Sequence, residues 1–221
     1  MMNIANTGQK LARASLLLLA ISALAACDSP AGSPAGQSAA ANAEPPLKGA
    51  RIGGPFTLTD QDGKTVRDTD FAGKYRIVYF GYSFCPDICP VDVQKLMLGL
   101  AQFEKADPAR GAKVQPIFIT VDPERDTAAA LKPFVSRYHP RLIGLTGPLD
   151  DITKVARSYA VSFRKAEGSA PDRYLVGHTQ IAFLMGPDDK PISALPLDDP
   201  STDIDEGAPN KVAADLALWV K

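Results

Sequence analysis

The chain has 221 residues, with 24 basic and 25 acidic side chains and a formal net charge of −1. It contains no basic block and no stripe that mixes basic and aromatic residues, so nucleic acid is not expected as a partner. Three cysteines are too few for a small disulfide-stapled scaffold, so the stability of the folded part must come from a hydrophobic core.

Residues 1–26 resemble a bacterial lipoprotein signal peptide. Lys10 and Arg13 form a positive start, and the 11 residues Leu16–Ala26 form a run of apolar and small side chains. A membrane-spanning helix needs about 20 such residues, so the run is typical of a secretory signal. It ends just before Cys27 in a sequence that resembles a lipobox, in which the cysteine is lipidated and becomes the new N-terminus.

Lipidation of Cys27 would tether the mature protein to a membrane. Asp28 resembles the signal that keeps lipoproteins on the inner membrane, so we expect the periplasmic face of the bacterial inner membrane. Loss of Lys10 and Arg13 with the signal would lower the net charge to about −3. The alternative is ordinary cleavage after Ala26, which would leave Cys27 as an unpaired exported thiol.

Residues 27–50 are rich in Pro, Ala, Gly and Ser and lack apolar periodicity, which predicts a flexible tether. Residues 51–221 are long enough for one domain with its own core. We therefore expect three parts: a signal peptide (1–26), a tether (27–50) and one folded domain (51–221).

The folded part begins with alternating residues around Asp62 and Gly63, which predicts an N-terminal β-hairpin. Hydrophobic periodicity predicts the remaining elements. In chain order we expect hairpin strands at 56–59 and 64–67, a strand at 75–82, a helix at 91–105, a strand at 114–121, a helix at 127–138 disturbed at Pro133, a strand at 142–145, a helix at 149–160, hairpin strands at 181–185 and 192–195, and a helix at 211–220.

This order predicts an α/β thioredoxin-like fold, with a central mixed sheet flanked by helices. Cys85 and Cys89 fall between the strand at 75–82 and the helix at 91–105. Open α/β sheets place ligands at this carboxyl end of a core strand. Pro90 suits the first helical position, so we expect Cys89 to be the N-cap and the helix dipole to favour its thiolate.

Two thiols at this junction have three interpretations: a redox pair, a clamp for a soft metal, or an inert disulfide. A disulfide between residues four apart would close a small loop and add little stability. Zinc needs three or four protein ligands, whereas two thiolates with one imidazole suit Cu(I).

The chain has two histidines. We expect His139 to be a capping or surface residue at a helix end. His178 precedes the strand at 181–185, and in a thioredoxin-like fold the loop before this strand faces the cysteine loop, so His178 is the candidate third ligand. We further expect Asp122 to cap a helix, and Tyr82 and Phe84 to form pocket walls.

Four blocks of sequence resemble the Sco/SenC family of copper-binding, thioredoxin-fold proteins, and the match runs in order through residues 53–221. The blocks are Gly81–Pro90, Thr120–Thr127, Tyr138–Pro140 with Ile143–Gly147, and Tyr174–Thr179 with Phe183–Asp188. Although two cysteines four residues apart would be a weak signal alone, four blocks together are a specific one.

The resemblance implies that Cys85, Cys89 and His178 bind one copper ion, as Cu(I) and also as Cu(II). It implies a metallochaperone that helps to assemble the dinuclear copper site of cytochrome c oxidase subunit II, with another periplasmic copper carrier as a second partner. The chain departs from the family at Gly177, where aspartate is usual. Loss of that carboxylate would alter the orientation of the imidazole or the charge of the pocket.

Three rival functions use the same residues. Cys85 and Cys89 could be the catalytic redox pair of a thiol–disulfide oxidoreductase that reduces the oxidase cysteines before they receive copper. A peroxiredoxin-like peroxidase is a weaker enzyme alternative. A copper or redox sensor that signals through a partner is a binding-module alternative.

Overall fold

The computed structural model describes residues 43–166, 173–199 and 201–221. The predicted signal peptide, Cys27 and most of the tether lie outside these residues. The strands are β1 (Thr57–Asp60), β2 (Thr65–Arg67), β3 (Tyr75–Gly81), β4 (Val114–Thr120), β5 (Ile143–Thr146), β6 (Phe163–Lys165), β7 (Val176–His178), β8 (Ala182–Met185) and β9 (Pro191–Leu195). The helices are α1 (Ile88–Ala106), α2 (Pro108–Gly111), α3 (Ala128–Val135), α4 (Leu149–Ser158) and α5 (Pro209–Trp219), with a short 3₁₀ helix at Asp68–Phe71.

Seven strands form the central sheet in the order β2-β1-β5-β4-β3-β8-β9. The β3–β4 and β4–β5 pairs are parallel, and the β1–β2, β1–β5, β3–β8 and β8–β9 pairs are antiparallel. This is the mixed sheet of the predicted thioredoxin-like fold, and the N-terminal hairpin is present as β1 and β2.

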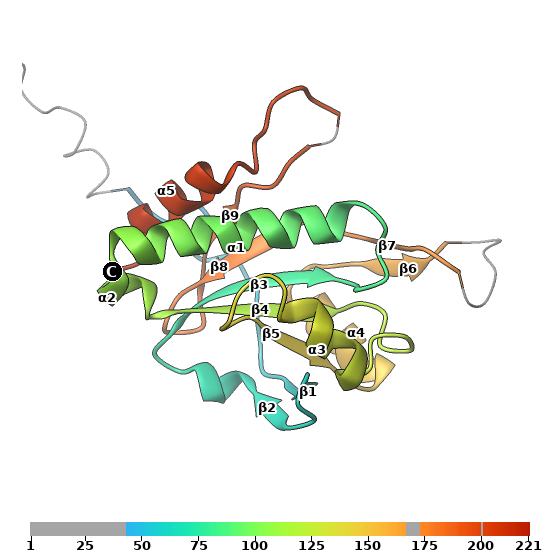
Figure 1. Ribbon diagram of the computed structural model, residues 1–221. Coiled ribbons are helices and arrows are strands. Elements are labelled where there is room, and N and C mark those ends of the chain that lie inside the picture. The colour runs from blue at the N-terminus through green and yellow to red at the C-terminus, as the bar shows by residue number, and fades with distance from the viewer. Residues whose placement is uncertain (1–42, 167–172, 200) are drawn as a thin grey trace, which may run out of the picture.

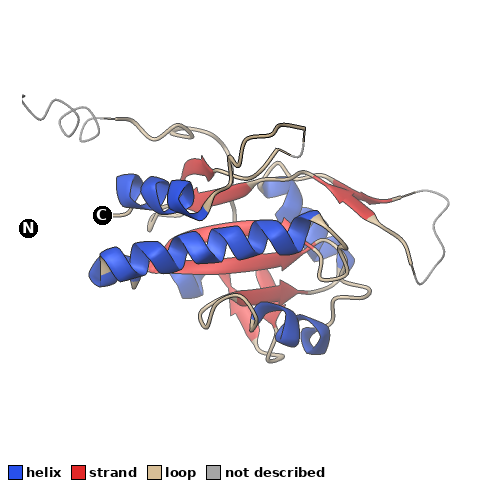
Figure 2. Ribbon diagram, turned by 45° about the horizontal axis from the view of Figure 1, so that its top comes forward, coloured by secondary structure: helices blue, strands red, loops and turns tan. Residues whose placement is uncertain are grey.

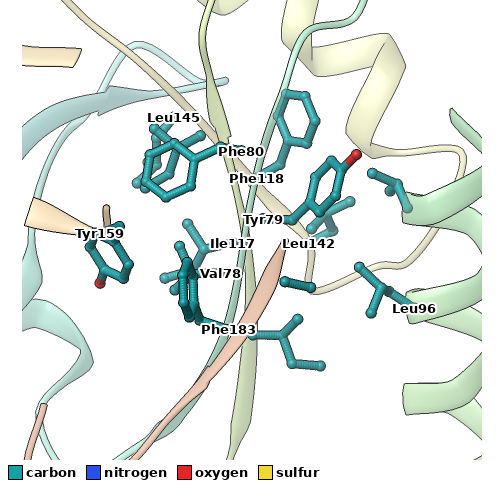
Figure 3. Close-up of a cluster of buried hydrophobic side chains, with 14 of the residues drawn as sticks. Val78, Tyr79, Phe80, Leu96, Ile117, Phe118, Leu142, Leu145, Tyr159 and Phe183 are labelled. Atoms are coloured by element: carbon teal, nitrogen blue, oxygen red, sulfur yellow. The ribbon is translucent and has the colours of Figure 1, made fainter. Parts of the chain in front are cut away.

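Helices cover both faces of the sheet. Figures 1 and 2 show α1, α5 and α3 on one face and α4 on the other. Figure 3 shows the two sides of the core: Tyr79 points toward Leu96 of α1, while Phe80 and Phe183 point toward Tyr159 at the end of α4. On the α1 side, the Phe118 ring packs against Phe134 of α3. Every residue of β3 and β4 is buried, as expected for central strands covered on both faces.

The pairing of β8 with β3 positions the cysteine loop, which follows β3, relative to His178, which precedes β8. Tyr79 of β3 lies opposite Ala182 of β8 in the antiparallel register. If this register is continued beyond the strands, His178 comes opposite Ser83, two residues before Cys85. The sheet therefore directs the predicted histidine toward the predicted cysteine loop.

Two predicted helix starts are wrong. Helix α1 begins at Ile88 rather than Val91, so Cys89 lies in its first turn and Asp87, not Cys89, is the N-cap. Asp122 does not cap α3: the helix begins at Ala128, and its N-cap is Thr127, whose hydroxyl accepts from the Ala130 N–H. In both places the residue with the expected capping pattern makes tertiary contacts instead.

The sequence analysis also missed the ribbon of β6 and β7, which forms a separate two-stranded sheet beside the main one. In Figure 1 this ribbon extends beyond the end of α1. Contacts of the domain reach further toward the N-terminus than residue 51, because the Leu47 N–H donates to the Ile192 carbonyl at 3.0 Å. No helix in the described ranges is both long and apolar enough to cross a bilayer.

Close packing of α1 on α5 depends on Gly99. A Cβ atom at this position would come within 2.5 Å of the Val212 Cβ and 2.8 Å of the Pro209 carbonyl oxygen. We expect Gly99→Val to lower the free energy of unfolding by about 1–3 kcal/mol, because the two helices must separate. Urea denaturation measures this change.

The matched control is Gly177→Val, since a Cβ at Gly177 meets no atom within 4 Å. Valine also suits a strand, so this variant should be as stable as the parent or more so. Equal stability losses in the two variants would contradict the packing argument.

Candidate metal centre

The two cysteines occupy different environments at the end of β3. Cys85 is half-buried in the loop, whereas Cys89 is completely buried in the first turn of α1. The sulfur of Cys89 packs against Gly81, where an added Cβ would lie 3.3 Å from the sulfur and 2.8 Å from the Tyr79 ring. Glycine at the end of β3 thus lets the first turn of the helix approach the sheet closely.

His178 reaches the same point from the end of β7. Its Nε2 lies 3.3 Å from the Cys89 Sγ, and its Nδ1 lies 3.0 Å from the Thr179 carbonyl oxygen. A carbonyl only accepts, so Nδ1 carries a proton in that bond and Nε2 is the ring nitrogen that faces the sulfur. The rings of Tyr79 and Tyr82 meet the imidazole edge-on, each with centroids 6.3 Å away.

The two thiols share one hydrogen bond, and it separates their pKa values. The hydrogen bond from Cys89, helped by the N–H groups of Asp87 and Cys89, lowers the pKa of the Cys85 thiol from 9.0 to about 5. The same bond, together with burial, raises the pKa of the Cys89 thiol. At neutral pH the pair is therefore a Cys85 thiolate beside a protonated Cys89.

This assignment reverses the expectation that the helix dipole favours a thiolate at Cys89. Because α1 begins before Cys89, it is the Cys85 Sγ that accepts from a first-turn amide, the Cys89 N–H at 3.5 Å. The helix terminus therefore stabilises the anion on the earlier, more exposed sulfur.

Of the two expected pocket walls, Tyr82 is confirmed and Phe84 is not. Tyr82 is buried; its oxygen accepts from the Val176 N–H at 3.3 Å, and its hydroxyl hydrogen-bonds to Cys85, so it connects the cysteine loop to β7. Burial raises the pKa of Tyr82 to about 12, which keeps this donor protonated. Phe84 points outward and is 51% exposed.

The segment Thr120–Thr127 holds the cysteine loop through Asp126. This fully buried carboxylate accepts hydrogen bonds from the Ser83 N–H at 2.9 Å, from the Ser83 hydroxyl, and from the Thr120 hydroxyl at 2.7 Å. Burial raises the pKa of Asp126, although its three donors oppose that shift. The carboxylate is a positioning group for the loop that carries Cys85.

The same segment holds the chain that leads to His178. Asp122 accepts from the Tyr174 hydroxyl at 2.6 Å and from the Arg125 Nε at 2.5 Å. The Arg125 guanidinium stacks 3.7 Å from the Tyr174 ring centroid and 5.0 Å from that of Phe84. Asp122 and Arg125 thus connect the β6–β7 ribbon, which ends in His178, to the cysteine loop. The sequence analysis did not predict this role.

His139 lies apart from the thiols. It is buried rather than on the surface, its Nε2 lies 3.2 Å from Glu104, and its Nδ1 accepts from the Arg141 N–H at 3.2 Å. These contacts agree with a structural role at the end of the α3 region.

Gly177 is exposed, and an added Cβ there would meet open space. Side chains alternate along a strand, so a residue at 177 points away from the face that carries His178. Because the Thr179 carbonyl already orients the imidazole, the missing carboxylate changes the charge beside the site more than the ring orientation.

The donor set fits a soft cation, because two sulfurs and one imidazole nitrogen converge at the end of the sheet. Within the described ranges no three His, Cys, Asp or Glu side chains are spaced as a preformed metal site. The Cys89 Sγ and the His178 Nε2 instead lie 3.3 Å apart, so a metal ion held by both would require loss of the Cys89 thiol proton.

Comparison with known proteins agrees with this geometry. The SCO1/SenC family model matches residues 44–210. The chain belongs to the SCO1/SenC family. It is 47% identical over 139 residues to protein SCO1 homolog 1, a mitochondrial protein of Arabidopsis thaliana, a match that covers 63% of this chain and 40% of the plant protein. Such matches span about half the length of the relatives, for example 53% and 47% of two SCO2 proteins.

Solved structures of the family have the same fold. Copper-bound ScoI of Bradyrhizobium japonicum is 39% identical, with a TM-score of 0.65, and the match covers 76% of this chain and 99% of that one. BsSco, described as a member of the Sco family of cytochrome c oxidase assembly proteins with a disulfide switch, is 25% identical. Its TM-score is 0.56, and the match covers 78% of this chain and 96% of that one.

The difference in pKa between the Cys85 and Cys89 thiols predicts how the alkylation rate of each depends on pH. In the reduced, metal-free protein, Cys85 should react with iodoacetamide at a rate that rises through pH about 5 and is constant above it, because its thiolate is then fully formed. Mass spectrometry of the modified peptides follows each cysteine separately.

Cys89 should remain unmodified through neutral pH because it is buried and protonated. A Cys85 rate that keeps rising up to pH 9, as for an ordinary thiol, would contradict the assignment.

The hydrogen bonds of the Asp126 carboxylate predict how its removal affects stability and the cysteine loop. Asp126→Ala leaves the Ser83 N–H and the Thr120 hydroxyl without their acceptor, so we expect a loss of about 1–3 kcal/mol in unfolding free energy. Hydrogen exchange in residues 81–89 should rise more than exchange elsewhere. Glu124→Ala, in the same segment, removes only an exposed ion pair with Lys165 and should change neither measurement appreciably.

Proposed function

We propose that this protein is a copper carrier that receives one copper ion on Cys85, Cys89 and His178 and delivers it to a partner. The observation that carries the proposal is the contact between the Cys89 Sγ and the His178 Nε2 at 3.3 Å, across 89 positions of sequence. The soft donor set and the bound copper of the similar Bradyrhizobium japonicum ScoI structure both support copper as the cargo.

The two thiols suggest how the cargo enters and leaves. Cys85 is already a thiolate and half exposed, so it provides the first contact for Cu(I). Cys89 then loses its proton to solvent as its sulfur binds, and the His178 Nε2 supplies the third ligand. Three ligands leave one side open, where the thiolates of a recipient can replace them one at a time.

We propose that the recipient is the dinuclear copper site of cytochrome c oxidase subunit II, and that a second periplasmic carrier supplies the metal. The description of a relative as a cytochrome c oxidase assembly protein supports this choice. The lipobox-like sequence before Cys27 supports a lipid anchor on the periplasmic face of the inner membrane, where such a site would be accessible.

A second function, thiol–disulfide exchange, is favoured by the lowered pKa of Cys85. The Cys85 thiolate would attack one sulfur of a client disulfide, and Cys89, after losing its proton, would displace the client from the mixed disulfide. The client then holds two thiols, and Cys85 and Cys89 are joined as a disulfide, which an external dithiol must reduce. The disulfide switch named for a relative supports this alternative.

Copper loading of the reduced protein tests the first function. We expect one Cu(I) per chain, with X-ray absorption showing two sulfur neighbours and one nitrogen neighbour. Cys85→Ser and Cys89→Ser should each abolish retention during dialysis against a Cu(I) chelator. His139→Ala is the matched control, because its imidazole contacts Glu104 rather than the thiols.

His178→Ala separates the two functions, because only copper retention needs the imidazole. A carrier should lose copper at least about tenfold faster, whereas disulfide exchange with a model peptide should continue. Unchanged copper retention in this variant would overturn the proposed ligand set.

A further inference from the structure

A groove lies beside the thiols, between the first turns of α1 and the chain that connects β9 to α5. It has a volume of about 600 Å³ and a mostly apolar lining. Three of its apolar side chains are unusually exposed: Ile88 (37%), Val91 (41%) and Ile204 (63%). A surface that keeps several large apolar groups in water beside a concave face is typical of an interaction site.

The rim of this groove is acidic. Six aspartates line the groove, the buried Asp92 and five others (Asp87, Asp198, Asp199, Asp203 and Asp205), together with a single cation, Lys95. Lys95 pairs with Asp198, and with Asp205 at 2.8 Å. In the described part of the chain Asp87, Asp199 and Asp203 form no ion pair, so the rim keeps a net negative charge.

The floor of the groove is connected to the metal-binding residues. Gln180, two residues after His178, donates to Asp92 at 2.9 Å and to the Asp198 carbonyl at 3.2 Å. Asp92 also accepts from the Tyr79 hydroxyl at 2.9 Å, and Tyr79 contacts Cys89. Asp87 and Ile88, which lie between the two cysteines in sequence, also line the groove, so a partner there would lie next to the cysteine loop.

We propose that this groove docks a segment of a partner protein in which Lys or Arg residues flank large apolar side chains. The apolar lining would bury the partner's apolar side chains, and the unpaired carboxylates would meet its cations. Complementary charge also speeds the encounter and excludes acidic partners. The inference concerns a surface outside the three ligands and stands whether or not copper is the cargo.

Other occupants fit this chemistry less well. Residues 27–42 contain no Lys or Arg and no apolar side chain larger than proline, so this part of the tether can satisfy neither the lining nor the rim. A second copy would bring its own net negative charge. An anionic membrane surface would be repelled by the carboxylates.

Fluorescence anisotropy tests the proposal with a short labelled peptide of alternating lysine and leucine. The protein is a soluble form that begins at Asp28, which keeps every described element. We expect saturable binding that weakens as salt rises, and binding at least about tenfold weaker for the peptide with glutamate in place of lysine. Backbone amide shifts in an NMR titration should concentrate at Ile88, Val91, Gln180 and Ile204.

Matched variants locate the binding. Ile204→Ser and Asp203→Lys should each weaken it about fivefold to tenfold. Leu98→Ser, at an exposed leucine of α1 that does not line the groove, and Asp150→Lys in α4 should leave the binding unchanged. The assay uses the metal-free protein, so failure of the copper proposal would not affect this test.

Four outcomes would overturn the proposal: equal binding of the acidic peptide, equal effects of the groove and control variants, amide shifts away from the groove, or dimerisation that the peptide displaces. Binding to phosphatidylglycerol vesicles that Asp203→Lys weakens would assign the groove to a membrane instead.

Discussion

The antiparallel pairing of β8 with β3 is the constraint on which the site depends. It sets Tyr79 opposite Ala182, and the same register brings His178 to the cysteine loop that follows β3. The first turn of α1 can then place Cys89 over Gly81, because a Cβ at 81 would crowd the sulfur at 3.3 Å and clash with the Tyr79 ring at 2.8 Å. A shift of one residue in this register would turn the core side chains of β8 to the other face of the sheet. Core packing therefore fixes the distance between the Cys89 sulfur and the His178 imidazole.

Two buried carboxylates hold in place the segments that the sheet brings together. Asp126 binds the loop before Cys85, and Asp122 binds the chain before His178, four residues apart in one segment that follows β4. Burial of these groups is tolerated because hydrogen-bond donors surround each one. The result is a site whose two halves come from distant parts of the chain but are held by one connecting segment. The half-exposed Cys85 thiolate, the protonated Cys89 and the oriented imidazole can then respond to a metal ion with small movements.

The acidic groove extends this arrangement to the surface. Its floor, through Gln180 and Asp92, belongs to the same hydrogen-bonded network as Tyr79 behind Cys89. Asp92 is buried, and burial raises the pKa of its carboxyl group. A partner that docks there would lie next to the cysteine loop, because Asp87 and Ile88 line the groove. Docking and transfer would then be two properties of one continuous surface, formed by the first turns of α1, the approach to β8 and the connection to α5.

The sequence by itself determined the order of strands and helices and the thioredoxin-like sheet, because hydrophobic periodicity depends on local spacing. It also determined Cys85, Cys89 and His178 as the candidates, since few side chains in the folded part bind soft metals. Only the tertiary structure decided which sulfur holds the negative charge, because that depends on where α1 begins and on burial of Cys89. The roles of Asp122 and Asp126, the β6–β7 ribbon and the groove were likewise decided by contacts between residues far apart in sequence, which local patterns do not encode.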